Sequence, residues 1–195
     1  MNEMVLVLRD SDVSKMTNGY GFFQIPLNTL KEVVEKNGFF VRRSHAEGDD
    51  SLRQLIPYVV VKNKFGLYLM VKRLNSQRET RLHGFYSLGI GGHINDTDEG
   101  NSPWLKFLSG MEREIEEEIE IKDAAWPKYI GVIRENVTPV SRVHLGIVFT
   151  LKAEIVGIRE KDKFLMKLVD AYDVSHFYDK LETWSRIAFE AIEKI

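Results

Sequence analysis

The chain has 195 residues, with 27 basic and 29 acidic side chains, a formal charge of -2 at pH 7 and no cysteine. This length fits one globular unit, and the balanced charge argues against the basic field typical of nucleic-acid-binding proteins. The lack of cysteine excludes disulfides, thiolate metal ligands and a cysteine nucleophile. With no signal peptide and no run of roughly 20 apolar residues, we expect a cytoplasmic protein that does not enter membranes.

The first fifty residues are predicted to be an N-terminal extension that packs on a core formed by residues 51–195. Within it, Leu27 to Lys36 (LNTLKEVVEK) places four apolar side chains on one helical face, and Asn37-Gly38 supplies a stop. Residues 44–51 (SHAEGDDS) are polar and read as a connector. The apolar positions on the predicted helix are Leu27, Leu30, Val33 and Val34.

Strand patterns follow the connector. Tyr58 to Lys62 and Leu67 to Arg73 are rich in β-branched and aromatic residues and flank a turn-like spacer, which predicts a hairpin with a positive φ at Gly66. Phe85 to Ile90 predicts a further strand that runs into Gly91-Gly92. Tyr129 to Ile133 and Val143 to Ile155 predict two later strands, the second with a bend.

The tail, residues 175–195, is predicted to be one amphipathic helix that packs against the sheet. Its apolar residues recur at spacings of three and four, which is the repeat of a helix with one buried face. They are Phe177, Leu181, Trp184, Ala188, Ala191 and Ile195.

A glutamate-rich helix is predicted between these strands. Asn101-Ser102-Pro103 begins it with a polar cap and a proline at the first helical position. An alternative start has Ser109 as the cap of a shorter helix. The buried stripe is predicted to consist of Trp104, Leu108, Met111, Ile115 and Ile119.

The glutamates fall on two flanks of that stripe. At 100° per residue, Glu114, Glu117 and Glu118 share one flank, whereas Glu112, Glu116 and Glu120 share the other. Like charges three or four positions apart repel, and negative charge at a helix C-terminus opposes the helix dipole. A solvated charged face is the simplest interpretation. The first set adjoins the buried stripe, however, and three carboxylates there suit a hard divalent ion, with Mg2+ favoured by oxygen ligands.

These residues resemble a known signature. Gly92 followed by Arg113-Glu114-Ile115-Glu116-Glu117-Glu118 is similar to the box of the Nudix hydrolases, GX5EX7REUXEEXGU, in which U is aliphatic. The resemblance implies an α/β fold, an α/β/α sandwich with a mixed central sheet. Two departures stand out. Asp98 holds the position of the first glutamate, with Glu99 beside it and seven extra residues before Arg113, and Glu120 replaces the terminal glycine.

The resemblance also implies roles. Glu114, Glu117, Glu118 and the Gly91 carbonyl would hold Mg2+, with Mn2+ as a substitute, while Arg113 would orient a carboxylate. Glu114 is one candidate general base, and Glu135 and Glu160 are others. Glu114, Arg113 and Glu117 form the expected catalytic set. The substrate would be a small-molecule diphosphate, such as a nucleoside diphosphate derivative.

Other charged and titratable residues carry weaker expectations. Lys72, Arg73 and Arg81 precede the glycine turn and suit diphosphate oxygens, as do Arg78 and Arg142 with less weight. His93 and His144 are interpreted as structural groups, since no His-x-x-x-His spacing indicates zinc. The chain contains no phosphate-binding loop of the kinase type and no complete dinucleotide fingerprint.

Two other functions stay open on sequence grounds. A non-catalytic Nudix-fold module that binds nucleotides would fit the altered box. An isopentenyl diphosphate isomerase would share the fold, but the common form of that enzyme uses a catalytic cysteine, which this chain lacks. A homodimer is compatible with the sequence, although no pattern indicates one.

Overall fold

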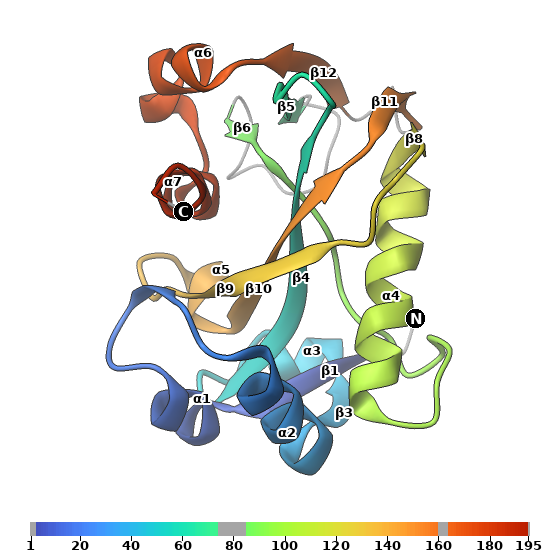
Figure 1. Ribbon diagram of the computed structural model, residues 1–195. Helices are drawn as coiled ribbons and strands as arrows, with labels where there is room; N and C mark the ends of the chain where they lie inside the picture. The colour runs from blue at the N-terminus through green and yellow to red at the C-terminus, as the bar shows by residue number, and fades with distance from the viewer. Residues whose placement is uncertain (1–2, 74–84, 160–163, 195) are drawn as a thin grey trace. The chain divides into compact units, whose positions relative to one another are not determined.

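The computed structural model describes residues 3–73, 85–159 and 164–194 (Figure 1). The chain forms two compact units that interleave along the sequence. Unit 1 comprises Met1–Tyr58, Gly91–Arg113 and Tyr129–Val148, and unit 2 comprises Val59–Ile90, Glu114–Lys128 and Phe149–Ile195. Four elements continue from one unit into the other. They are the strand β4 (Leu52–Lys62), the helix α4 (Pro103–Glu118), the strand β9 (Lys128–Arg134), of which only Lys128 belongs to unit 2, and the strand β10 (His144–Lys152).

Unit 1 contains a strand with a buried centre that the sequence patterns did not reveal. This strand, β1 (Met4–Arg9), pairs antiparallel with β3 (Phe39–Arg42) on one side and with β4 on the other, so residues 1–50 contribute to the main sheet. The division into an extension and a core domain remains a prediction. The other elements of unit 1 are α1 (Asp10–Met16), β2 (Gly21–Phe23), α2 (Leu27–Asn37), α3 (Arg43–Ala46) and α5 (Pro139–Arg142).

The predicted helix at residues 27–36 is confirmed as α2, with one correction to its buried face. Leu30 and Val34 are fully buried, but Leu27 is exposed because it stands at the first turn of the helix. The polar connector at residues 44–51 is helical in its first half, where α3 begins at Arg43. Chain reversal at 47–51 then leads into β4.

A charge network lies between α1, β4 and β9 in unit 1. Asp10 accepts hydrogen bonds from Arg53 Nε at 2.6 Å and from Arg134 Nη2 at 2.9 Å. Both arginines are buried, so each guanidinium depends on this carboxylate for its charge balance. Burial opposes ionisation of Asp10, but the two arginines outweigh it and hold the pKa of that carboxyl below its usual range.

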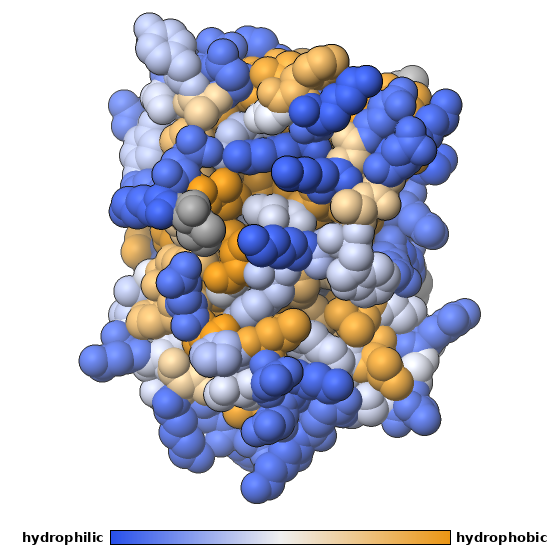
Figure 2. Space-filling view, viewed as in Figure 1, coloured by the Kyte–Doolittle hydropathy of each residue, from blue (hydrophilic) through white to orange (hydrophobic). Residues whose placement is uncertain are grey.

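Unit 2 confirms the predicted hairpin turn. Gly66 has φ 81°, and the Asn63 side chain accepts hydrogen bonds from the backbone N–H groups of Phe65 and Leu67. The strand after this turn, β5 (Tyr68–Arg73), also pairs with β12 (Phe164–Val169), which the sequence patterns missed. Figure 2 shows apolar surface among charged side chains on the face viewed; on β12, Leu165 and Met166 are exposed.

The segment predicted as one strand at residues 85–90 is two short strands. β6 (Tyr86–Ser87) pairs with β5, whereas β7 (Gly89–Ile90) pairs with β4. The chain changes partner at Leu88, whose N–H donates to the Ser185 hydroxyl. The break therefore coincides with the change of partner strand.

The long strand predicted at residues 143–155 also divides. β10 ends at Lys152, and β11 (Glu154–Ile158) pairs antiparallel with β8 (Ile119–Lys122) in a separate two-stranded sheet. Backbone bonds join Gln54 N to the Val143 carbonyl and Ala153 N to the Lys62 carbonyl, so β4 and β10 run in the same direction. With the antiparallel pairs, these bonds make the main sheet mixed, as predicted.

The prediction of one tail helix over residues 175–195 is wrong. The structure has α6 (Ala171–His176), a 3-10 turn at Tyr178–Lys180 and α7 (Thr183–Ile192). Between the turn and α7, Leu181 bridges to Tyr86, and the Glu182 N–H donates to the Tyr86 carbonyl. This strand-like contact interrupts the helix although Leu181 keeps its buried position. No helix among the described residues is long and apolar enough to cross a membrane.

Candidate active site

The helix α4 forms as the sequence predicts. It begins at Pro103, and Ser102 is its cap: the Ser102 hydroxyl accepts from Leu105 N at 3.3 Å, and the Ser102 carbonyl accepts from Lys106 N at 3.0 Å. The alternative start at Ser109 is wrong, because the helix runs through that residue without interruption.

The buried stripe of α4 is largely as predicted. Trp104, Met111, Ile115 and Ile119 are buried, but Leu108 is only half-buried. Phe107 is fully buried instead and stacks on Trp104 with ring centroids 5.2 Å apart. The buried face therefore extends toward Phe107 and Gly110 rather than toward Leu108.

The two rows of glutamates differ in exposure. Glu114 and Glu118 are half-buried, whereas Glu112, Glu116 and Glu120 are exposed. Glu117 is exposed, although the prediction grouped it with the first row. Among the described residues, no three His, Cys, Asp or Glu side chains are grouped as a ready metal-binding cluster. The donor chemistry nevertheless fits Mg2+, because Glu114, Glu117 and Glu118 offer only carboxylate oxygens from one flank of the helix.

The C-terminal end of α4 lacks the glycine of the family pattern and is completed by another segment. Arg159, just after β11, donates from its backbone N–H to the Glu118 carbonyl at 2.9 Å. Its side-chain Nε donates to the Ile119 carbonyl at 3.3 Å. These two bonds satisfy carbonyls at the end of the helix that have no partner within it, and the chain passes directly from α4 into β8.

Arg113 forms an ion pair with Asp98. Arg113 Nε donates to Asp98 Oδ1 at 2.7 Å, and Nη2 donates to Asp98 Oδ2 at 3.3 Å and to the His93 carbonyl at 2.9 Å. Asp98 is buried, whereas the neighbouring Glu99 is exposed. Asp98, rather than Glu99, is therefore the buried acid of this turn, and its equivalence to the first glutamate of the box stays a prediction.

The turn that carries Asp98 is held tightly against α4. The Asp98 carboxylate also accepts from Asn95 N at 2.7 Å, and Lys106 Nζ donates to the Asp98 carbonyl at 2.7 Å. Gly110 allows this approach, since a Cβ there would lie 2.4 Å from Asp98 Oδ2. Sequence reasoning missed Lys106 and Gly110, because their contacts depend on how the longer connection folds back.

Gly91 occupies a position that no other residue fits. Its φ is 155°, and a Cβ at this residue would lie 1.7 Å from the Pro57 carbonyl oxygen. The close approach of two backbone segments, rather than turn propensity alone, therefore requires glycine. Whether the Gly91 carbonyl binds a metal ion stays a prediction.

His93 and His144 lie together, which their separation in sequence did not suggest. Their Nε2 atoms are 3.4 Å apart, and His144 Nδ1 lies 2.6 Å from the Val140 carbonyl. Burial, together with the charges of Arg43, His144 and Arg113, lowers the pKa of His93 to about 3. Burial also lowers the pKa of His144. Both rings are thus neutral at pH 7.

The residues predicted to bind substrate or to act as the general base lie on different elements, and some of them fall outside the described residues. Lys72 lies on β5 with its Nζ 5.5 Å from the centre of the Tyr86 ring, and the backbone of Arg73 pairs with Phe164. Glu135 is buried in unit 1. Arg142 lies 3.9 Å from Asp50. Arg78, Arg81 and Glu160 fall outside the described residues.

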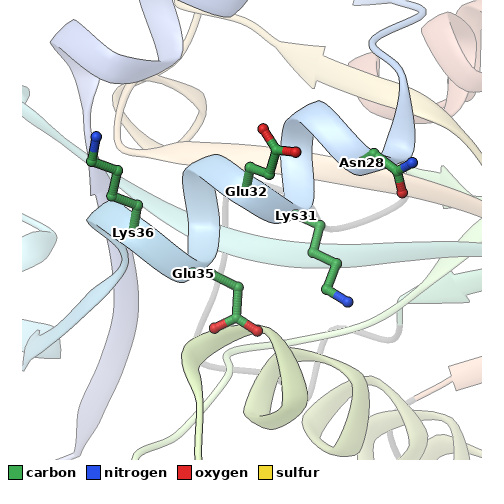
Figure 3. A pocket seen from close by; sticks show the side chains of 5 residues that line it. All are labelled: Asn28, Lys31, Glu32, Glu35 and Lys36. Atoms are coloured by element: carbon green, nitrogen blue, oxygen red, sulfur yellow. The ribbon is translucent and has the colours of Figure 1, made fainter.

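A surface hollow lies on α2, lined by polar and charged side chains that extend from the helix in different directions (Figure 3). Glu35 turns toward the start of α4, where it accepts a hydrogen bond from the Ser102 hydroxyl at 2.8 Å. None of the predicted site residues lines this hollow, which has no convergent catalytic groups. Its lining residues are Asn28, Lys31, Glu32, Glu35 and Lys36.

Comparison with known proteins settles the family. The chain is 33% identical to Tm1382, described as a candidate Nudix hydrolase, over 98% of this chain and 99% of that one, with a TM-score of 0.89. The chain belongs to the Nudix hydrolase family. It is therefore a hydrolase of diphosphate linkages, and the predicted α/β fold with a mixed sheet is confirmed.

Two further relatives extend this comparison. Protein YmaB of Bacillus subtilis (strain 168) is 31% identical over 99% of this chain and 98% of its own length. A Nudix hydrolase from Nitrosomonas europaea shares the fold at 11% identity and a TM-score of 0.50, over 73% of this chain and 89% of that protein. A search of family models gave no match.

Proposed function

We propose that the protein hydrolyses the diphosphate linkage of a nucleoside diphosphate derivative or another organic diphosphate in a Mg2+-dependent reaction. The observation that carries the proposal is the Arg113-Glu114-Ile115-x-Glu117-Glu118 sequence on an unbroken helix, with Arg113 paired to a buried acid. Repulsive carboxylates are retained at a helix C-terminus, where they lower stability, and a bound cation would offset that repulsion.

The proposed division of labour follows the exposure of the carboxylates. Glu114, Glu117 and Glu118, with the Gly91 carbonyl, would hold Mg2+ or Mn2+. When bound, the metal supplies Lewis-acid polarisation of the diphosphate and lowers the pKa of water. Glu114 is half-buried on the same flank of the helix as Glu118, which supports it as the general base. Glu135 and Glu160 are the alternatives for that role.

Diphosphate binding is assigned to cationic side chains on and after β5. Lys72, Arg73 and Arg81 would contact the phosphate oxygens, for which arginine provides paired donors and lysine a single charge. Lys72→Met should raise KM several-fold with little change in kcat. Lys64→Met, in the exposed turn before β5, is the matched control. An unchanged KM for Lys72→Met would remove Lys72 from the substrate site.

The decisive experiment compares the two rows of glutamates. Dinucleoside polyphosphates, nucleoside triphosphates, nucleotide sugars and other diphosphates are assayed with and without Mg2+. On the best substrate, Glu117→Gln or Glu118→Gln should reduce kcat/KM by about 100-fold or more, whereas Glu112→Gln and Glu116→Gln should stay near wild type. Equal effects in both rows, with folding intact, would contradict the assignment.

The general base is tested separately. Glu114→Gln should abolish the fall of kcat toward acidic pH, while Mn2+ affinity, measured by electron paramagnetic resonance, falls less than in Glu118→Gln. If Glu114→Gln keeps the wild-type pH profile and Glu135→Gln loses it, the base is Glu135. Saturable binding of substrates without turnover on any panel member would instead favour the non-catalytic module.

A further inference from the structure

His93, His144 and Gln54 share one face of the sheet in unit 1. Gln54 N donates to the Val143 carbonyl at 2.8 Å, and in a parallel ladder this bond places Gln54 beside His144. On its other side Gln54 is directly opposite Val7. Val7 packs in an apolar cluster with Val5, Ala46 and Leu52, so the same face is covered by α3.

The hydrogen bonding of His144 determines which ring nitrogen is available. A carbonyl can only accept, so His144 Nδ1, 2.6 Å from the Val140 carbonyl, carries the proton. His144 Nε2 then bears a lone pair and faces His93 Nε2 at 3.4 Å. A histidine that ligates a metal typically donates its other N–H to a backbone carbonyl in this way.

The separation of the two nitrogens matches a shared cation. Two imidazole nitrogens bound to one tetrahedral Zn2+ at about 2.0–2.1 Å are about 3.3 Å apart. A good N–H···N hydrogen bond is shorter than the observed 3.4 Å, because the usual distance for an N–H donor is about 2.9–3.0 Å.

Buried polar atoms on the same face provide an independent observation. Gln54 is fully buried, and within the described part of the chain neither its Oε1 nor its Nε2 has a hydrogen-bond partner. Asn95, which bridges to Val5 and so faces the same way, has a buried Oδ1 that likewise makes no hydrogen bond to the described residues. Each such atom costs roughly 1–3 kcal/mol unless a ligand or water satisfies it.

The surrounding charges tolerate a cation. The positive charge of Arg43 lowers the pKa of both rings, but its guanidinium is bonded to Glu3 at 3.0 Å and to Glu47 at 2.8 Å. Glu47 also acts electrostatically on His144, and Arg53 contributes a weaker positive charge. The positive charge of Arg113, which acts on His93, is matched by Asp98.

We propose that His93 and His144 are ligands of a transition-metal site of the Zn2+ class, with the side-chain oxygen of Gln54 as a further protein donor. Nitrogen ligands select borderline ions such as Zn2+, Co2+ or Cu2+, whereas the carboxylates of α4 suit Mg2+. The two sets of ligands can therefore be distinguished by metal preference. This inference does not depend on the proposed hydrolytic mechanism.

The test measures Zn2+ binding by calorimetry in excess Mg2+, on protein first treated with a chelator. Wild type should bind one Zn2+, and His93→Gln and His144→Gln should bind it at least 100-fold more weakly. His176→Gln is the matched control, since His176 Nδ1 also contacts a carbonyl four residues earlier but the ring is exposed. Glu118→Gln should leave this affinity unchanged.

Spectroscopy identifies the ligands directly in the wild-type protein. Cu2+ should give an electron paramagnetic resonance spectrum with nitrogen hyperfine coupling, and Zn2+ should shift the imidazole 15N signals of His93 and His144. Zinc affinity that survives in a folded His144→Gln protein, or that is lost in Glu118→Gln instead, would overturn the proposal. Imidazole 15N signals that do not shift when Zn2+ is added to the wild-type protein would also overturn the proposal. This measurement remains decisive if the variants fail to fold.

Discussion

Arg113 and Asp98 are joined by two hydrogen bonds across fifteen positions of sequence, with Nε to Oδ1 at 2.7 Å and Nη2 to Oδ2 at 3.3 Å. The family spacing is shorter by seven residues, yet the pair forms because the longer connection folds back onto α4. Arg113 also holds the His93 carbonyl, so one guanidinium links the helix to the glycine turn.

Loss of this pair should reduce both activity and stability. Asp98→Asn removes the charge opposite Arg113, and we expect the free energy of unfolding to fall by about 1–3 kcal/mol and kcat/KM to fall about 10- to 100-fold. Urea unfolding and steady-state kinetics measure the two effects. Glu99→Gln is the control, and a larger loss there would mean that the wrong acid has been assigned.

Gly110 should tolerate no side chain while Asp98 is present. Gly110→Ala gains roughly 1 kcal/mol in helix propensity, but the new Cβ lies 2.4 Å from Asp98 Oδ2, and the clash should leave the variant about 2 kcal/mol less stable overall. In an Asp98→Ala background the same substitution should cost much less. Additive effects in this double-mutant cycle, followed by urea unfolding, would show that the two positions do not interact.

Gly91→Ala should be among the most damaging single substitutions. The Pro57 carbonyl oxygen lies 1.7 Å from the new Cβ, and backbone atoms cannot move aside as a flexible side chain can. We expect destabilisation of about 3 kcal/mol or more, measured by thermal and urea unfolding. Gly157→Ala is the comparison, since no atom lies within 4 Å of its Cβ position and its stability should change little.

Acid should weaken the network around Asp10. Its pKa is lowered in the folded state, so its contribution to stability is present above the unfolded value of about 4 and is lost as pH falls through the lower folded value. Asp10→Asn should lower the free energy of unfolding at pH 7 by about 2 kcal/mol and flatten its decline below pH 4. Asp50→Asn, with an exposed side chain, should keep the wild-type pH profile in urea titrations.

The sequence predicts this protein best where local signals agree. The cap at Ser102, the proline after it and the apolar stripe together define α4, and Gly66 has the conformation that its turn requires. Predictions fail where a distant segment decides the outcome. Leu181 has helical spacing, but its contact with Tyr86 interrupts the tail helix. β1 is covered on both edges by strands that sequence periodicity alone does not bring to it.

The candidate site likewise contains features that local sequence predicts and features that depend on distant segments. The glutamates are assigned to two rows from helical geometry alone, and their exposures follow that assignment except at Glu117. The choice of Asp98 over Glu99 and the meeting of His93 with His144 could not be predicted, because each depends on contacts between segments far apart in sequence. Such contacts leave no local pattern.

The bonds from Arg159 to the carbonyls of Glu118 and Ile119 have a consequence for how this box can evolve. In a chain whose helix ends at its own glycine, the cap and the carboxylates belong to one local segment of the sequence. Here the end of the helix is bonded by Arg159, which lies just after β11, so position 159 carries a constraint that a chain with a local glycine cap does not have. Replacement of Arg159 should therefore cost more stability in this chain than in one whose helix ends at its own glycine.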